Sequence, residues 1–221
     1  LGISSDIRLV VSDGEYESAL SFSIEVLNVN DAPEMRDMAL VVTEDSILII
    51  GQGEIASVYT DIDGDELESI RIESLPVHGS LYNNGQLIEE GSVINGSVIH
   101  MEYRSDSDYT GSDSFRVIAS DGQLETDMST LAILVTSDND APEISGSPAE
   151  TVDEGTAYAG FSPTVSDPDS TDHSYRLENH PSWLTLDTST GALSGTPLKG
   201  TLGISSDIRL VVSDGEYESA L

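Results

Sequence analysis

The chain has 221 residues, enough for about two domains of ordinary size. Its 41 acidic and 8 basic residues give a formal net charge of −33, which argues against nucleic acid or an anionic membrane as a partner, because both bind positively charged surfaces. There is no cysteine for a disulfide framework, and no apolar run approaches the roughly 18 residues of a membrane span.

The first twenty residues form a perfect internal repeat. Residues 1–20 recur without a change as residues 202–221, an offset of 201 residues. Such a match indicates a tandem array with that period in a longer parent protein. Residue 1 lies inside a strand-like pattern, so we expect the chain to be a segment of that protein.

Apolar residues alternate with polar ones along most of the chain, which predicts half-buried β-strands. Turn signals separate these runs, and no segment has a convincing amphipathic helical pattern. We therefore predict an all-β chain of antiparallel sandwiches. The clearest alternating runs are Ile7/Leu9/Val11, Phe22/Ile24/Val26, Ile99/Met101/Tyr103, Phe115/Val117/Ala119 and Leu131/Ile133/Val135; the turns are Asp13-Gly14, Asn84-Gly85, Asn95-Gly96, Asp121-Gly122 and Asp214-Gly215.

Two similar motifs follow strand-like runs and precede new ones, as expected of joints between domains. The first joint is Asn28-Val29-Asn30-Asp31-Ala32-Pro33-Glu34, and the second is Ser137-Asp138-Asn139-Asp140-Ala141-Pro142-Glu143. They divide the 201-residue period into two lengths that each suit one sandwich. We predict a C-terminal domain fragment (1–31), a complete domain (32–140) and the N-terminal part of a further domain (141–221).

The last of these parts lacks a counterpart of Ser21-Phe22-Ser23-Ile24-Glu25-Val26, so we expect an unpaired sheet edge and a gap in its core. Residues 1–31 of another molecule carry such a strand. This predicts head-to-tail strand exchange between chains as one type of partnership.

The joints resemble the Asx-x-Asn-Asp-x-Ala-Pro linker of cadherin repeats. Residues 181–186 (Pro-Ser-Trp-Leu-Thr-Leu) with 190–197 (Thr-Gly-Ala-Leu-Ser-Gly-Thr-Pro) resemble the dystroglycan-type cadherin-like domain. Residues 109–115, running into Ser120-Asp121-Gly122, resemble cadherin-like repeats of giant bacterial surface adhesins. The resemblance implies tandem Ig/cadherin-like sandwiches joined by short calcium-binding linkers, in a secreted bacterial protein at the cell surface.

Acidic residues recur where loops would meet these joints, and Ca²⁺ prefers six to eight oxygen ligands. Bound cations would also relieve the self-repulsion of so acidic a chain. Because successive strands run in opposite directions, alternate loops of a sandwich lie at its opposite ends, so each joint is met by its own set of loops. The resemblance to cadherin repeats implies that the same loops carry the calcium ligands. The second joint would use Glu44, Asp106, Asp108, Asp138, Asn139, Asp140, Asp167, Asp169 and Asp214; the first, with weaker occupancy, Asn30, Asp31, Asp61, Asp63 and Asp121.

Two departures from the cadherin pattern qualify this ligand set. The acidic Leu-Asp-Arg-Glu motif is missing, so Asp106 and Asp108 are placed only by their loop. The first linker position is Asn28 or Ser137 instead of aspartate, which favours fewer ions per joint. The alternative for any single acid is a solvated surface. An EF-hand at Asp61 fails, because Glu66 and Ile72 stand where glycine and glutamate are required.

No sequence signal indicates an enzyme. The histidines at 78, 100, 173 and 180 lack zinc-site spacing, and no nucleophile motif or phosphate-binding loop occurs. The leading hypothesis is a calcium-rigidified extender segment of a large surface adhesin that supports cell adhesion or biofilm formation, with neighbouring repeats as its partners. A polysaccharide-binding module is the alternative, and a salt-adapted protein whose charge serves only solubility is the third.

Overall fold

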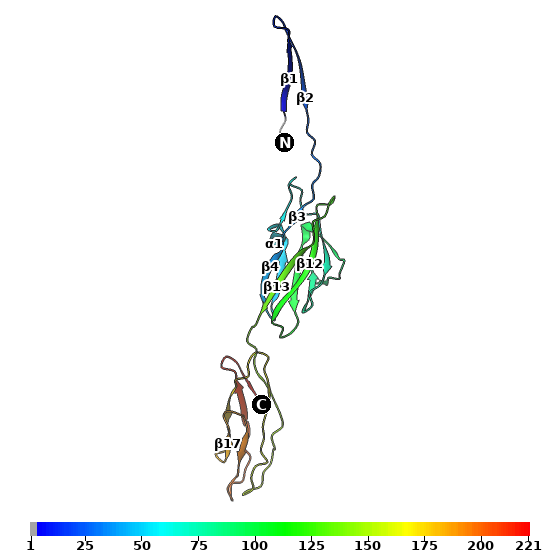
Figure 1. The fold of residues 1–221 in the computed structure, drawn as a ribbon. Helices are drawn as coiled ribbons and strands as arrows, with labels where there is room; N and C mark the ends of the chain where they lie inside the picture. Colours follow the sequence, from blue (N-terminus) through cyan, green and yellow to red (C-terminus); the bar gives the residue numbers. More distant parts are fainter. Residues whose placement is uncertain (1–3) are drawn as a thin grey trace. The chain divides into compact units, whose positions relative to one another are not determined.

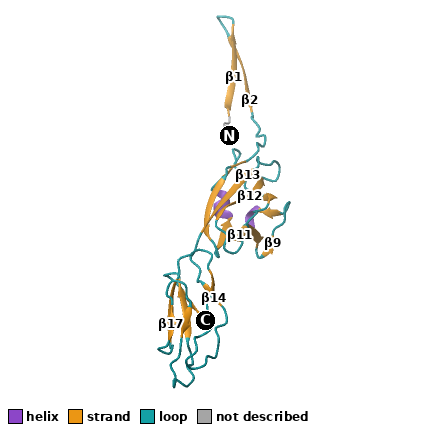
Figure 2. Cartoon of the chain, turned by 60° about the horizontal axis from the view of Figure 1, so that its bottom comes forward, coloured by secondary structure: helices purple, strands orange, loops and turns teal. Residues whose placement is uncertain are grey.

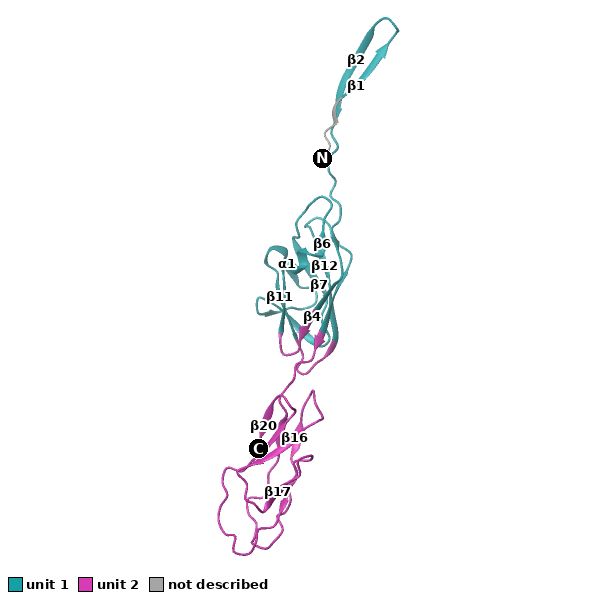
Figure 3. Ribbon diagram, turned by 90° about the vertical axis from the view of Figure 1, so that its left-hand side faces the viewer, with its two compact units in different colours: residues 1–40, 47–104, 112–134 teal, residues 41–46, 105–111, 135–221 magenta. Residues whose placement is uncertain are grey.

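The computed structural model describes residues 4–221, which divide into two compact units (Figure 3). Unit 1 comprises Leu1–Leu40, Ile47–Arg104 and Ser112–Leu134, and unit 2 comprises Val41–Ser46, Ser105–Gly111 and Val135–Leu221. Almost all regular structure is strand (Figure 2), which confirms the predicted all-β class. Within the described part of the chain, no helix combines the length and hydropathy needed to cross a bilayer.

The central sandwich contains a five-stranded sheet and a four-stranded sheet (Figure 1). The order in the larger sheet is β10 (Val93–Asn95), β7 (Ser69–Ser74), β12 (Gly111–Ser120), β13 (Ser129–Thr136), β4 (Met38–Thr43). The order in the smaller sheet is β5 (Ile47–Gly51), β11 (His100–Ser105), β8 (Gly79–Asn83), β9 (Gln86–Leu87). A short ladder joins β3 (Glu34–Met35) to β6 (Tyr59–Thr60).

The core of this sandwich follows the predicted alternation. Phe115, Val117 and Ala119 on β12 are fully buried, and so are Met101 and Tyr103 on β11. Because side chains on a strand point alternately to its two faces, the intervening residues meet solvent or the sheet edge. The hydrophobic pattern therefore fixes which face of each sheet forms the core.

The two asparagine–glycine pairs of the central sandwich behave differently. Asn84 and Gly85 have φ angles of 50° and 76° and close the two-residue hairpin between β8 and β9, as predicted. Asn95-Gly96 was predicted to be a hairpin turn, and this is wrong. Asn95 caps the short 3-10 helix η1 (Gly96–Val98), which carries the chain from β10 in one sheet to β11 in the other. A Cβ on Gly96 would lie 2.1 Å from the Leu67 carbonyl oxygen, so this position requires glycine.

A short helix was not expected. Helix α1 (Gln52–Ala56) follows β5 and buries Ile55 against the core. The Glu54 carboxylate accepts a hydrogen bond from the Gly51 N–H at 2.9 Å, which satisfies one free donor at the helix start. A segment of five residues is too short to show helical periodicity in the sequence.

The C-terminal part of unit 2 consists of short strands. They are β14 (Glu143–Ser145) paired with β15 (Thr164–Ser166), β17 (Leu184–Leu186) paired with β18 (Leu193–Gly195), and the sheet β16 (Ser174–Glu178), β19 (Arg209–Ser213), β20 (Glu218–Ala220). Its core is small: Leu184, Leu193 and Leu210 are buried, with Phe161 and Trp183 partly buried against them. A cavity of about 580 Å³ adjoins this core.

Residues 9–20 and their copies, residues 210–221, fold as the same hairpin in different surroundings. Strands β1 (Ser4–Ser12) and β2 (Glu17–Ile24) pair in the register that β19 and β20 also use. Leu9 and Val11 on β1 are 63% and 67% exposed, whereas their counterparts Leu210 and Val212 are 3% and 0% exposed. Local sequence thus forms the hairpin, and tertiary contacts decide whether its apolar face is covered.

Candidate metal centre

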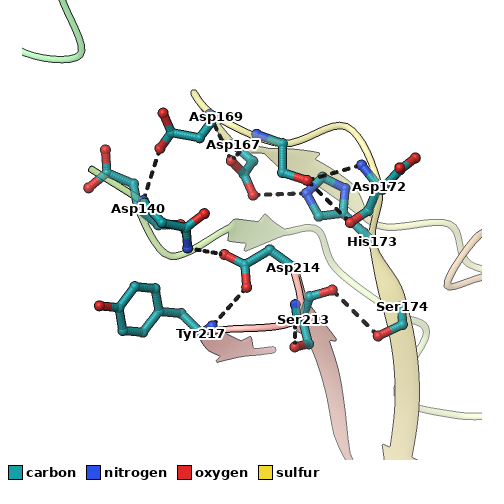
Figure 4. Close-up of polar contacts among 12 residues, drawn as sticks. Asp140, Asp167, Asp169, Asp172, His173, Ser174, Ser213, Asp214 and Tyr217 are labelled. Atoms are coloured by element: carbon teal, nitrogen blue, oxygen red, sulfur yellow. Dashed lines mark hydrogen bonds and ion pairs between the residues drawn. The ribbon is translucent and has the colours of Figure 1, made fainter. Parts of the chain in front are cut away.

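The second joint is tied on three sides by hydrogen bonds to acidic side chains. The Asp138 N–H donates to Glu44 Oε1 at 3.2 Å, and the Asp140 N–H donates to Asp169 Oδ2 at 2.9 Å. Between them, the Asn139 side-chain amide donates to Asp214 Oδ2 at 2.8 Å. Three loops and the linker therefore direct carboxylates to one place within unit 2, as Figure 4 shows for Asp140, Asp169 and Asp214.

Two of the three contributing loops are each shaped by one carboxylate oxygen that accepts hydrogen bonds from the backbone of its own turn. Asp167 Oδ1 accepts from the backbone N–H groups of Asp169 and Ser170, at 3.0 and 2.8 Å. Asp214 Oδ1 accepts from Glu216 and Tyr217 N–H groups, both at 2.7 Å. Such Asx turns explain why aspartate stands at both positions, since its short side chain bonds backbone two residues on. One oxygen holds the turn, and the other has a side-chain partner: the His173 ring at Asp167 Oδ2 and the Asn139 amide at Asp214 Oδ2.

Hydrogen-bond donors lower the pKa values of Asp214 and Asp167, the two aspartates that form these turns. The Tyr217 N–H, followed by the Asn139 amide and the Glu216 N–H, lowers the pKa of Asp214. Burial alone raises the pKa of Asp167, but the His173 ring, 3.0 Å from Asp167 Oδ2, and the backbone donors outweigh it and leave the pKa lowered. Both groups are thus ionised at neutral pH.

Glu44 is the exceptional group of the second joint. It begins the tight turn between β4 and β5, held by its own N–H donating to the Thr136 carbonyl at 2.8 Å, and its residue is only 1% exposed. Its Oε2 atom and Asp140 Oδ2 are both buried, and neither has a hydrogen-bond partner among the described residues. A buried carboxylate oxygen without a donor is costly unless a cation is bound to it.

Neighbouring carboxylates make it still more costly to keep Glu44 and Asp140 ionised. Burial, followed by the carboxylates of Asp169, Asp140 and Asp45, raises the pKa of Glu44 despite the Asp138 N–H. Burial raises the pKa of Asp140 as well, followed by Asp45, Asp169, Asp108 and Asp138. These carboxylates repel one another without a nearby basic residue among the groups that perturb them. The second joint therefore concentrates negative charge, which a cation would offset.

A buried carboxylate elsewhere in the chain shows the contrast. Asp113, 7% exposed, accepts hydrogen bonds from the backbone N–H groups of Val77, His78 and Ser114 and from the Tyr103 hydroxyl, at 2.8 to 3.0 Å. This is how a structural carboxylate is normally satisfied. Glu44 receives one backbone donor on one oxygen, so its burial needs a different explanation.

The first joint repeats the same bonds. The Asn30 amide donates to Asp121 Oδ2 at 2.9 Å, and the Asp31 N–H donates to Asp63 Oδ2 at 2.7 Å. Asp61 Oδ1 accepts from the N–H groups of Asp63, Gly64 and Asp65, while its Oδ2 is buried without a partner among the described residues. The Asn30 amide, with the Leu124 and Gln123 N–H groups, lowers the pKa of Asp121.

The first joint adds a third aspartate that the sequence argument missed. One oxygen from each of Asp61, Asp63 and Asp65 lies within 4.8 Å of the others. Burial, followed by Asp61, Asp63 and Asp121, raises the pKa of Asp65. Burial, followed by the charges of Asp61, Asp121 and Asp65, raises the pKa of Tyr59 to about 12. The Asp-x-Asp-Gly-Asp spacing of residues 61–65 could have indicated Asp65, but the sequence argument used that spacing only to test for an EF-hand, which does not fit.

Three predicted residues of the second joint remain, and the structure ties only two of them to it. Asp106, Asp108 and Asp138 are exposed, and Asp108 is in the left-handed region with φ 56°. Asp108 and Asp138 act on Asp140 through charge, and Asp138 also contributes its N–H to Glu44. Asp45, next to Glu44 with φ 58°, was not predicted, although it raises the pKa of both Glu44 and Asp140.

Comparisons with known proteins agree with this architecture. Residues 30–134 match the family model described as a bacterial Ig domain, and residues 141–220 match the one described as a putative Ig domain. Families of this type are generally non-enzymatic and typically extracellular. No curated protein sequence matches the chain.

Several solved structures are similar at low identity. An EC1-2 structure of human protocadherin-24 is 14% identical with a TM-score of 0.47, over 86% of this chain and 93% of that one. Drosophila N-cadherin EC1-4 is 15% identical with a TM-score of 0.35, over 100% of this chain and 58% of that one. An endo-fucoidan hydrolase from glycoside hydrolase family 107 is 20% identical with a TM-score of 0.35, over 97% of this chain. This chain spans 32% of the hydrolase, about a third of its length.

Proposed function

We propose that the chain is an extracellular extender segment of a large bacterial surface adhesin, in which calcium held at the joints between Ig-like domains stiffens the array. The observation that carries the proposal is the buried Oε2 of Glu44, which lies in a cluster of like charges and has no hydrogen-bond partner among the described residues. The cadherin-like linker and the 201-residue repeat support it, because both are expected of tandem extracellular modules.

The donor set at the second joint fits Ca²⁺. Glu44 and Asp140 each offer an oxygen that lacks a partner, and Asp169, Asp214 and Asn139 supply further carboxylate and amide oxygens from the same cluster. Hard oxygen ligands with several negative charges are what calcium prefers. A bound ion would supply the missing positive charge and crosslink the turn at Glu44 to the loops at Asp169 and Asp214.

The mechanical consequence follows from where these residues belong in the sequence. Glu44 comes from the domain before the linker, whereas Asp169 and Asp214 come from the domain after it. An ion held by both resists bending at the linker, which would keep a distal binding domain of an adhesin away from the cell. Extracellular modules of this kind bind calcium at about 10⁻⁴–10⁻³ M, near extracellular concentrations.

The proposal is tested by small-angle X-ray scattering on the full chain in calcium and in chelator. We expect a longer maximum dimension and a narrower distance distribution in calcium, and a more flexible chain after chelation. Glu44→Gln should reduce this difference. Glu90→Gln, which removes the same charge from an exposed residue, should leave it intact. Identical scattering in both conditions contradicts the extender model.

A polysaccharide-binding module is the second candidate, and the cavity of about 580 Å³ favours it. Trp183 and Tyr158 line this cavity with their ring centroids 6.2 Å apart, and aromatic faces commonly contact sugars in such sites. Binding to a panel of immobilised polysaccharides distinguishes the two functions, because an extender should bind none of them.

A further inference from the structure

The smaller sheet of the central sandwich has one long free edge. Its strands are ordered β5, β11, β8, β9, and among the described residues no other strand pairs with the outer side of β5. The opposite edge strand, β9, is two residues long, whereas β5 runs for five, from Ile47 to Gly51. Strand β5 therefore presents a row of backbone donors and acceptors to which another strand can pair.

No feature of β5 blocks this edge. Proteins usually protect a free edge with charged side chains, proline or a bulge. The sequence of β5, ILIIG, has no charge and no proline, and it pairs with residues 100–104 of β11 in unbroken register. Ile47 and Ile49 are 50% and 45% exposed, and they lie on the same face of the strand. The edge thus combines unpaired backbone groups with exposed apolar side chains.

Charge does not oppose the approach of a second acidic chain at this face. The four strands of the smaller sheet contain one acidic residue, Glu102, although the whole chain has 41. The Arg104 guanidinium donates to Glu102 Oε2 at 2.7 Å and lies over the Tyr82 ring, 4.7 Å from its centroid. Glu102 and Arg104 are the residues of β11 opposite Ile49 and Ile47. The surface beside the exposed isoleucines is therefore locally neutral.

The edge is also self-complementary. When two copies of β5 align antiparallel about Ile49, Ile49 of one copy faces Ile49 of the other, and Leu48 faces Ile50. Every pair in this alignment joins uncharged residues, and β-branched pairs stabilise such ladders. Strand β4, the free edge of the larger sheet, exposes one large apolar side chain, Val41, so it lacks a matched pair on one face.

We propose that β5 is a lateral contact between two copies of this chain, in which antiparallel β5–β5 pairing joins the two smaller sheets into one continuous sheet. The contact is isologous, so it closes at two copies. It uses five residues a side, against roughly 20–30 in a standard interface, so a single contact is weak. In the tandem array expected from the 201-residue repeat, the edge recurs in every period, and contacts between two arrays reinforce one another.

The first test is sedimentation equilibrium of the full chain over a wide concentration range, in calcium and about 0.15 M salt, which screens the net charge of −33. We expect a weak equilibrium between monomer and dimer. Ile49→Lys should weaken association at least about tenfold, because it places a charge at the centre of the ladder.

Val93→Lys is the matched control, because it makes the same charge change at a 64% exposed side chain on β10, an edge of the larger sheet. Both variants lower the net negative charge equally, so relief of general repulsion would strengthen association in both. Opposite behaviour of the two variants therefore identifies β5 as the contact. A melting temperature close to that of the unchanged chain verifies that each variant is folded.

A single cysteine locates the contact, since the chain has no cysteine of its own. Ile49→Cys brings two thiols opposite each other across the two-fold axis, with Cα atoms about 4.5–5.5 Å apart, which is within disulfide reach. Air oxidation should therefore crosslink Ile49→Cys chains in pairs. Val41→Cys, at a 63% exposed position on β4, should not crosslink at the same concentration.

Three results would overturn the proposal: monomer alone at every concentration, dimers that persist in Ile49→Lys, or crosslinks in Val41→Cys chains but not in Ile49→Cys chains. The contact does not use the carboxylates of the second joint. Glu44→Gln should therefore leave dimerisation unchanged while it lowers calcium affinity, so the failure of one proposal is distinguishable from the failure of the other.

Discussion

The two joints have the same local bonds but differ in what surrounds them. In both, an asparagine amide donates to the aspartate of a Ser-Asp-Gly turn, and the next N–H donates to the second aspartate of an Asp-x-Asp loop. Among the described residues, the second joint also contains a buried glutamate, Glu44, whose Oε2 has no hydrogen-bond partner there. The linker bonds are thus common to both joints, and the buried carboxylate from the preceding domain is what distinguishes the second.

Removal of calcium should give the largest effect. At a concentration about 100 times Kd, a ligand bound only to the folded state stabilises by about 2.7 kcal/mol, which shifts the Tm by roughly 5–10 °C for a chain of this size. We expect differential scanning calorimetry to show this loss on chelation. A Tm that follows sodium chloride and ignores calcium would instead support the salt-adapted alternative.

Removing the Asn139 side-chain amide should separate the stability that hydrogen bonds give the second joint from the stability that bound calcium gives it. Asn139→Ala removes the 2.8 Å hydrogen bond to Asp214 and should lower the Tm by roughly 3 °C even in chelator. Asn30→Ala removes the equivalent bond to Asp121 at the first joint. We expect the two losses to be similar in chelator, because this part of the two joints is the same, and thermal melts of both variants measure it.

Glu44→Gln should act in opposite directions with and without calcium. Without the ion, the variant removes a buried charge repelled by Asp169 and Asp140, so the Tm should rise. With the ion, it removes a charged ligand, and calcium affinity by calorimetry should fall about tenfold. Glu90→Gln should change neither quantity. A Tm that falls in both conditions would show that Glu44 is held by protein donors alone.

Asp65→Asn examines the feature particular to the first joint. Burial and the neighbouring aspartates raise the pKa of Asp65, so in chelator we expect neutralisation to raise the Tm slightly. In calcium, the variant should weaken a second, weaker binding step by about tenfold and spare the tighter one. Loss of the tighter step would assign it to the first joint and reverse the proposed order of occupancy.

The pH dependence should be the smallest effect. Glu44 and Asp140 have folded-state pKa values above their usual values, so the folded state binds more protons than the unfolded state in the intervening range. In chelator, stability should therefore increase as the pH falls from neutral through the raised folded-state pKa values of these two groups. In calcium it should decrease, because protonation competes with the ion. Thermal melts across this range measure both slopes.

The locally determined parts of the fold and site were predictable from the sequence. The alternating runs of β11, β12 and β13 and the Asn84-Gly85 hairpin depend on neighbouring residues, and so do the Asx turns at Asp167 and Asp214. The Asn95-Gly96 turn was predicted wrongly because the same dipeptide serves a hairpin or a crossover between sheets. Which of these forms depends on the approach of Leu67 to Gly96, a tertiary contact.

Burial was the property that the sequence did not reveal. Glu44 looks like any acid in a turn, and only the packing of β4 against β13 shows that it is enclosed with an oxygen lacking a donor. The repeated twenty residues make the same point, since Val11 is 67% exposed and its identical counterpart Val212 is 0% exposed. The hydrophobic pattern of the sequence predicts a strand, but only the three-dimensional structure shows what covers the apolar face of that strand.

The most direct measurement is a crystal structure of the chain grown in saturating calcium, with anomalous scattering used to locate the ion. We predict an anomalous peak at the second joint within bonding distance of Glu44 Oε2 and of carboxylates from Asp140 and Asp169. Water alone at that position, with Glu44 Oε2 satisfied by protein donors, would contradict the account.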